Sequence, residues 1–483
     1  MPFGPGGFRH VSAVPFLLSG YPGCTRSESF SLEFRGSGFP DAAVTYPKHE
    51  EKRSCIRYAT LLLPRGFRMP LPKVIPALAD LTQDIAGAIP VHLLHDWATG
   101  ERDLFAAYSV LSSFEIQGTV VSSDTSGLSR MTRERDLLDV LSLISQPKEI
   151  LHALGREIGG RAIGTWVADN TEMFYPAGLD ADTVVDAMGE VQFRIQERLQ
   201  IRIGMCIHPG RFYEIGGGLY GGDAYQVEYL AEQCAGPGEI LLTESAVRSL
   251  KTVKSDDLYL KTFPHEDSQE QAYLLRSNRR ASGLQEREPL YPHPFPPDFF
   301  EILHRFQEPG DVEALKRKIY EQWLRECVVV FLAREREPQE ARSLTGLLDD
   351  LVINALMDTV IRETMPGTDH IASSGGGIAI LTFDHPTDAV DFVRAVHIKL
   401  AENGLPVQVG IDAGPVLLFQ NSRGPSGIAG DPINIASKLA EDVGRPGCIC
   451  VTEKAFQRLG DSSEHERFEV TVSGVALKGF ILT

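Results

Sequence analysis

Two aspartates in the first half of the chain stand where strands are expected to end in polar turns. Asp124 follows the apolar stretch 117–121, and Asp169 occupies the tip of a predicted hairpin. Backbone N–H groups at such a turn suit phosphate oxygens. Carboxylates from neighbouring strand ends can hold the two divalent cations used in phosphoryl displacement. The phosphate contacts are expected from Thr125, Ser126, Gly127 and Leu128.

Each aspartate also has a simpler interpretation. Taken alone, Asp124 fits a helix N-cap and Asp169 fits an ordinary turn residue. The functional interpretation gains because the two residues stand at matching points of a structural unit that occurs twice in the chain.

The repeated unit is clearest in the ranges 222–242 and 430–451. Both begin with Gly-Asp, continue with a helical period, break at Pro-Gly and end in an apolar strand followed by Thr-Glu. Similar apolar strands, 201–210 and 407–414, precede them. Self-similarity on this scale indicates a duplicated domain.

The elements that position these residues follow the same order in both copies. Hydrophobic periodicity predicts helices over 134–144, 148–158, 344–362 and 387–402. Asp103 and Asp311 are expected to cap two further helices. The predicted parts are a poorly ordered segment (1–68), a partly helical lead-in (69–113), the first copy (114–276), a proline-rich linker (277–310), a connecting helix (311–326) and the second copy (327–483).

The composition excludes several classes of function. The formal net charge of −18 disfavours broad binding to nucleic-acid phosphates. The seven cysteines are scattered without a CxxC pair, which suits a reducing, cytoplasmic setting. No stretch is apolar enough to predict a membrane span.

Two motifs resemble the catalytic domains of class III nucleotide cyclases, the adenylyl and guanylyl cyclases. They are D-x-x-G-L-S, starting at Asp124, and GDPINIASK, over 430–438. The resemblance implies an α+β fold, in which two tandem cyclase-like domains, each a ferredoxin-like sheet with flanking helices, form an intramolecular pseudo-heterodimer. It also implies that Asp124 and Asp169 bind two Mg²⁺ or Mn²⁺ ions. An Asn and an Arg from the other domain would orient the ribose and stabilise the transition state.

The two copies divide this set of residues. The second copy has Asn434 at the Asn position and Lys438 where Arg is usual, while its metal positions correspond to Ala333 and Gly376. In the first copy, the Asn and Arg positions hold Gln226 and Leu230. The resemblance therefore implies a single complete site, with its metal half in the first copy.

Several positions depart from the family pattern. Lys438 lacks the planar fork with which Arg grips phosphate in two places. Arg202 lies two residues early for a phosphate-binding Arg of some relatives. The base-selecting positions correspond to Ala372 and Gly427, which cannot read a base edge.

The sequence supports three hypotheses. The first is a cyclase that converts a nucleoside triphosphate into a 3′,5′-cyclic nucleotide and pyrophosphate. The alternative is a degenerate, non-catalytic relative that binds nucleotide or a regulatory protein partner. The third is a structural repeat in which the helix over 311–326 serves oligomerisation. The sequence leaves the base, the effector and a homo-oligomeric state open.

Overall fold

The computed structural model describes residues 29–32, 44–47 and 91–482, with internal gaps. The gaps are 127–130, 132–134, 167–169, 253, 266–267, 277–278, 288–289, 308–309, 335–342, 366–370, 376, 422–423, 460–464 and 473–474. Gly127, Leu128, Asp169 and Gly376 therefore lie outside the described residues. In the segment 1–68, β1 (Ser29–Leu32) pairs antiparallel with β2 (Val44–Pro47), and the prediction of poor order falls otherwise on undescribed residues.

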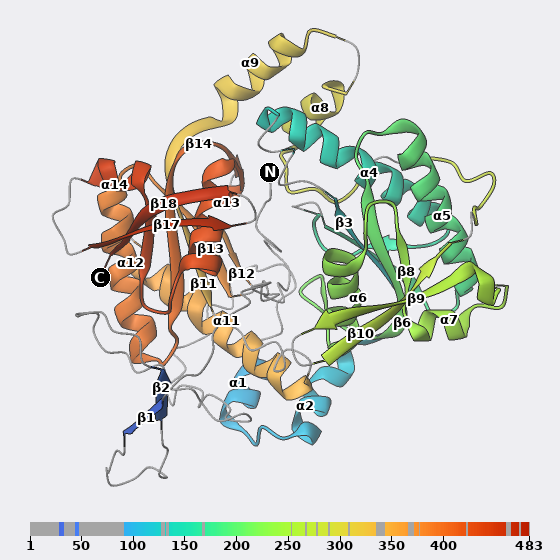
Figure 1. Cartoon of the computed structure of the whole chain (residues 1–483), viewed down its shortest axis with the longest axis horizontal. Helices are drawn as coiled ribbons and strands as arrows, with labels where there is room; N and C mark the ends of the chain where they lie inside the picture. The colour runs from blue at the N-terminus through green and yellow to red at the C-terminus, as the bar shows by residue number, and fades with distance from the viewer. Residues whose placement is uncertain are drawn as a thin grey trace.

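Two eight-stranded sheets form the framework of the molecule (Figure 1). The first contains β3 (Glu115–Thr125), β4 (Arg161–Ala162), β5 (Thr171–Pro176), β6 (Ile203–Ile215), β7 (Gly218–Tyr220), β8 (Ile240–Leu242), β9 (Leu258–His265) and β10 (Ser268–Leu275). The second contains β11 (Leu324–Arg334), β12 (Ile371–Gly375), β13 (Ile378–Phe383), β14 (Val407–Asn421), β15 (Gly424–Ala429), β16 (Ile449–Thr452), β17 (His465–Val472) and β18 (Val475–Leu482).

The two sheets have the same strand order. The first runs β4-β5-β3-β6-β8-β10-β9, with β7 paired to β6. The second runs β12-β13-β11-β14-β16-β18-β17, with β15 paired to β14. We call the parts built on them the first and the second unit. This mixed α/β architecture agrees with the expected cyclase-like fold.

Helices cover both faces of each sheet. The first unit contains α4 (Leu137–Glu157), α5 (Ala181–Arg198), α6 (Gly222–Tyr229) and α7 (Glu244–Ser249). The second contains α11 (Leu344–Thr364), α12 (Pro386–Glu402), α13 (Asp431–Lys438) and α14 (Glu453–Leu459). Within the part of the chain that the structure describes, no helix has the length and apolar character needed to cross a bilayer.

Strand alternation assigns each core residue to a face of its sheet. On β3, Val121 packs with α4 and α5, whereas Val120 packs with α6. On β11, Val330 packs with α11 and α12, whereas Val329 packs with α13. Because successive side chains point to opposite faces, Asp124 lies on the α6 face of the first sheet.

One predicted boundary was wrong. The segments 134–144 and 148–158 form a single helix, α4, with Pro147 inside it. Apolar residues on both sides of Pro147, including Ile144 and Leu151, are buried in one core, and this burial outweighs the hydrogen bond that proline removes. The helix ends before Gly159, which has φ +92°, as the sequence predicted.

The linker between the units is folded, and it contains a helix that the sequence analysis missed. This helix, α8 (Pro297–Arg305), precedes α9 (Val312–Trp323), which Asp311 caps as predicted. Phe299 and Trp323 pack around Phe419 of β14, and the ring centroids of Phe299 and Phe419 are 4.6 Å apart. These side chains share one buried cluster with the core of the first unit. The apolar face of α9 is thus used within the chain, which disfavours an oligomerisation role for this helix.

A second connection lies at the opposite end of the molecule, where α1 (Val91–Thr99) and α2 (Leu104–Leu111) pack on both units (Figure 1). The indole N–H of Trp97 donates to Asp349 of α11 at 2.9 Å. Leu111 joins a buried cluster with Ile215 of β6 and Leu348 of α11. Asp103 caps α2, which confirms that prediction. The two units are therefore tied together at both ends.

The aromatic cluster around Phe419 makes a stability prediction. Replacing Phe419 with alanine leaves a cavity among packed rings, so the free energy of unfolding should fall by about 3–5 kcal/mol. Ile398→Ala is the control, because that side chain is 63% exposed and its loss should change stability by no more than about 0.5 kcal/mol. Urea denaturation measures both, and equal effects would contradict the packing of Phe419 in this cluster.

Candidate functional site

The candidate metal half-site lies at the end of β3. Asp124 is half-buried and pairs with Gly204 of β6, and Thr125 ends the strand. The N–H of Ser126 then donates to the carbonyl of Arg202 at 2.9 Å, which holds the turn against β6. The predicted strand-end position of Asp124 is confirmed.

The neighbouring hydroxyls of β3 belong to Ser123 and Thr125, which alternate with Asp124 and therefore lie on the other face of the sheet. The Thr125 side chain is 4% exposed, and its Oγ1 has no hydrogen-bond partner among the described residues. A buried polar atom without a partner calls for an explanation, such as a ligand or an ordered water. Beside it, the hydroxyls of Ser123 and Thr171 lie 2.6 Å apart and tie β3 to β5. On the α6 face, the carboxylate oxygens of Asp124 are of the kind that suits Mg²⁺ or Mn²⁺.

The second carboxylate of the predicted pair, Asp169, lies outside the described residues, two positions before β5 in sequence. Its approach to Asp124 therefore stays a prediction. Among the residues that the structure describes, no group of three or more His, Cys, Asp or Glu side chains could hold a metal ion by itself.

The equivalent place in the second unit is apolar or internally paired. Ala333 of β11 is the counterpart of Asp124. Ala333 pairs with Gln408 of β14, and Asp124 pairs with Gly204 of β6. Gln408 and Gly204 each precede the residue at which the strand begins to pair with its parallel neighbour. Ala333 is buried in the core beneath α13. The next residue, Arg334, forms a buried ion pair of 2.5 Å with Asp350. Among the residues described around Ala333, the carboxylate of Asp350 is thus already paired with Arg334.

Asn434 and Lys438 lie on α13. Both side chains are 9% exposed, and the helix packs on the second sheet through Ile433 and Ala436. The chain continues from Lys438 into a π-helical turn, 439–443. In Figure 1, α13 and α6 lie on the sides of the two units that face each other.

Two acidic residues, Glu441 and Asp442, follow Lys438 on the next helical turn. Burial raises the pKa of Glu441 to about 8, the charge of Asp442 adds to this rise, and the charge of Lys438 opposes it. Lys438 also lowers the pKa of Asp442, although burial raises that pKa overall. The ammonium group therefore has carboxyl groups within its electrostatic reach.

The structure corrects the residues assigned to the first unit. Both α6 and α13 lead into five-residue π-helical turns, which begin at Leu230 and Leu439. When Leu230 is aligned with Leu439, Tyr225 takes the position of Asn434 and Tyr229 takes the position of Lys438. The sequence analysis had assigned Gln226 and Leu230 to these positions. The reason is that six residues separate Gly-Asp from Leu-Ala-Glu in the first copy, whereas seven separate them in the second.

The two tyrosines cannot replace the Asn and the cation. Their rings stack with centroids 6.3 Å apart, and the hydroxyl of Tyr229 donates to the carbonyl of Pro264 at 2.9 Å. The side-chain amide of Gln226 donates a hydrogen bond to Glu270 of β10 at 3.3 Å. In the first unit, the positions aligned with Asn434 and Lys438 thus hold Tyr225 and Tyr229.

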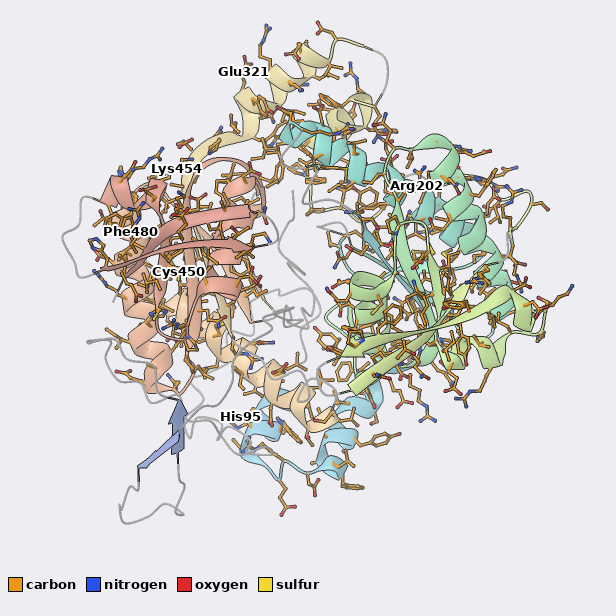
Figure 2. All side chains as sticks on the ribbon, in the orientation of Figure 1. His95, Arg202, Glu321, Cys450, Lys454 and Phe480 are labelled. Carbon is orange, nitrogen blue, oxygen red and sulfur yellow. The ribbon has the colours of Figure 1, made fainter. Side chains whose placement is uncertain are left out.

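Arg202 has a structural role. Its guanidinium donates to the carbonyls of Leu199 and Ile201 at 2.6 and 2.8 Å, and to that of Gln196 at 3.3 Å. These contacts satisfy backbone groups at the end of α5. Arg202 (labelled in Figure 2) is therefore not assigned the phosphate contact expected from the sequence.

The two base-selecting positions, Ala372 and Gly427, carry no polar side chain and are closely packed. Ala372 is buried in β12 among apolar residues. At Gly427 of β15, an added Cβ would lie 3.5 Å from the Phe419 ring and 3.9 Å from the carbonyl oxygen of Pro294 in the linker. A larger side chain at Gly427 would therefore meet the linker.

Comparison with known proteins gives structural neighbours only. No protein-family model matches the chain, and no curated protein matches it. A class III adenylyl cyclase-like ATP-binding protein from Pseudomonas aeruginosa is 12% identical, with a TM-score of 0.42 over 71% of this chain and 85% of its own. The adenylyl cyclase CyaB from P. aeruginosa is 16% identical, with a TM-score of 0.29 over 35% of this chain and 98% of its own.

A third neighbour is the guanylate cyclase domain of RhGC from Catenaria anguillulae in complex with GTP. It is 15% identical, with a TM-score of 0.27 over 33% of this chain and 97% of its own. The structural neighbours are thus class III adenylyl and guanylyl cyclase-like proteins. Identities and TM-scores are low throughout, so this likeness does not tell which residues of this chain act.

Proposed function

We propose that the protein is a nucleotide cyclase with one active site shared between its two units. The observation that carries this proposal is the complementary split of polar residues. Asp124 lies one residue before the end of β3 in the first unit, where the second has buried Ala333. Asn434 and Lys438 lie on α13 in the second unit, where the first has two stacked tyrosines. Only one of the two symmetric sites can then be complete.

Each residue has a separate task in the proposed reaction. Asp124 and Asp169 would hold two Mg²⁺ or Mn²⁺ ions, which supply Lewis-acid activation of the phosphates and the hydroxyl. Thr125, Ser126 and the backbone N–H groups after them would donate hydrogen bonds to phosphate oxygens. Asn434 would orient the ribose so that its 3′-hydroxyl faces the α-phosphate. Lys438 would offset the negative charge that develops there as pyrophosphate leaves.

A direct assay tests the proposal. The full chain is incubated with Mn²⁺ and each of the four nucleoside triphosphates, and pyrophosphate is measured. Release with at least one nucleotide is expected. Nucleotide binding without release from any of the four would favour the second candidate, a non-catalytic nucleotide-binding protein. The low exposure of Asn434 and Lys438, and the packing of the linker on Gly427, are the observations that favour this candidate.

The packing at Ala372 and Gly427 predicts weak base selectivity. Strong discrimination needs buried polar groups that a wrong base leaves unpaired, and neither residue supplies one. The kcat/KM values for ATP and GTP should therefore differ by less than roughly 100-fold. Gly427→Asp should not sharpen the preference, because the new side chain meets Phe419 and Pro294. A preference of roughly 10,000-fold for one purine would show that another group reads the base.

The environment of Lys438 predicts an alkaline loss of turnover. Below pH 8 Glu441 is mostly protonated, since its pKa is raised to about 8, and the charge of Lys438 is available to a phosphate. Above that pH the carboxylate of Glu441 competes for Lys438, so kcat should fall. The side-chain amide that Glu441→Gln introduces cannot ionise. This variant should therefore show little or no fall of kcat above pH 8. An unchanged limb in Glu441→Gln would assign the loss to another group.

A further inference from the structure

Helix α2 has apolar side chains on all its sides. Its sequence is LFAAYSVL, in which Ser109 is the only residue without a largely apolar side chain. On its inner side, Ala107 and Leu111 are fully buried and pack on β6 and α11. A helix that is apolar all round is normally buried on all sides. The outer side of α2 is nevertheless exposed at the edge of the molecule (Figure 1).

Three side chains form the exposed outer side, and we call them the α2 patch. Leu104 is 65% exposed, Phe105 is 83% exposed and Tyr108 is 49% exposed. They are neighbours, because residues three and four positions apart lie on the same side of a helix. Together they leave roughly 400 Å² of apolar surface open to solvent. Contiguous apolar patches of this size on soluble proteins often have a function.

The charge beside the α2 patch is acidic. Glu101 and Asp103 directly precede Leu104 in sequence, and both are exposed. Arg102 is the only Lys or Arg in the range 91–114. It is half-buried, and its guanidinium lies 3.5 Å from the carboxylate of Asp349 on α11. The apolar surface is therefore flanked by two exposed carboxylates, which favour a positively charged partner.

We propose that the α2 patch docks a basic, amphipathic helix of a partner protein. The apolar side of that helix would pack on Leu104, Phe105 and Tyr108, in the way that helices pack on each other through rows of side chains. Its Lys or Arg side chains would lie beside Glu101 and Asp103. Because α2 packs on both units, the docked helix would lie at one of the two connections between them.

Two other occupants fit the α2 patch less well. A second copy of the chain would bring the same carboxylates to the contact, and like charges repel. Its share of roughly 400 Å² is also about half of the 800 Å² that each partner buries in a typical stable interface. An anionic lipid surface would be repelled by the same carboxylates and by the net charge of −18.

The test measures binding of a fluorescein-labelled amphipathic helix, built from leucine and lysine, to the full chain by fluorescence anisotropy. The specific part of this binding is the part that depends on Phe105, since the acidic chain also attracts cations without a defined site. Phe105→Ser should weaken binding by about 10-fold or more, as expected for an aromatic anchor. Glu101→Lys should weaken it by about 3-fold, because it reverses one charge at the rim.

Two variants serve as matched controls. Ile398→Ser removes an exposed apolar side chain from α12, and Glu244→Lys reverses an exposed charge on α7. Both should bind the peptide as the wild type does. Phe105→Ser should keep the midpoint of thermal unfolding, since the side chain is exposed, and Tyr108→Ser is the second variant if Phe105→Ser folds poorly.

Several results would overturn the proposal. One is equal peptide affinity in the wild type, Phe105→Ser and Tyr108→Ser. Another is equally tight binding of a control helix built from leucine and glutamate, since the carboxylates should repel it. A concentration-dependent dimer that Phe105→Ser abolishes, measured by sedimentation equilibrium, would assign the α2 patch to a second copy. Phe105-dependent cosedimentation with phosphatidylcholine vesicles would assign it to a lipid surface.

Discussion

Asp124→Ala is expected to abolish metal-dependent turnover while the chain stays folded. The side chain is a half-buried carboxylate at a strand end and contributes no apolar volume to the core, so its loss should cost about 1 kcal/mol of stability. The catalytic effect should be much larger. Charge neutralisation by the bound cations contributes several kcal/mol to the transition state, so kcat should fall by roughly 1000-fold or more. The same result is expected for Asp169→Ala.

The control for these variants is Glu244→Ala. Glu244 is an exposed acid on α7 of the same unit and forms a surface ion pair with Arg248. Its replacement removes the same charge and should leave both turnover and unfolding nearly unchanged. Equal losses in Glu244→Ala and Asp124→Ala would mean that net charge, and not a cation site, explains the effect.

The second large effect is expected in the other unit. Asn434→Ala and Lys438→Ala should each lower kcat by on the order of 100-fold, since each removes one preorganised group that acts on the ribose or the developing charge. Gln226→Ala in the first unit should leave kcat nearly unchanged, because its amide is engaged by Glu270 and it has no task in the proposed reaction. The measurement is steady-state pyrophosphate release. Similar losses in all three variants would indicate two working sites and contradict the division of residues between the units.

Much of the fold could be predicted because its signals are local. Helix α11 begins at Leu344 as expected, and Ser343, Asp311 and Asp103 cap helices with their side chains. The repeated pattern predicted two similar units, and the two sheets have the same strand order. Caps and hydrophobic periods depend on residues close in sequence, so they are readable without the fold.

The errors arose where distant residues decide the structure. Prolines 292–297 suggested an extended linker, yet Pro297 begins α8, a position where proline is favoured. The packing of this segment on Phe419 depends on β14, more than a hundred residues away in the chain, and no local signal marks it. The one-residue shift in α6 could have been found from Leu-Ala-Glu, which both copies share.

The candidate site was predictable in part. The strand-end position of Asp124 and the helical position of Asn434 and Lys438 follow from pattern and resemblance. The hydrogen bond from Asn170 to Glu232 was missed because it joins the residue before β5 to the π-helical turn after α6, across 62 residues. The structural role of Arg202 was missed although its three carbonyl partners, in Gln196, Leu199 and Ile201, are close in sequence, because an Arg at the end of a helix also fits a phosphate contact.

The most direct test of the shared site is a product assay with Mn²⁺ on the wild type, Asp124→Ala and Lys438→Ala. Cyclic nucleotide and pyrophosphate are quantified in the same reaction. The account predicts equal amounts of both from the wild type and a loss of both in each variant, although the two residues belong to different units. Undiminished products in either variant, or no cyclic nucleotide from a wild type that binds nucleotide, would contradict a single cyclase site built from both units.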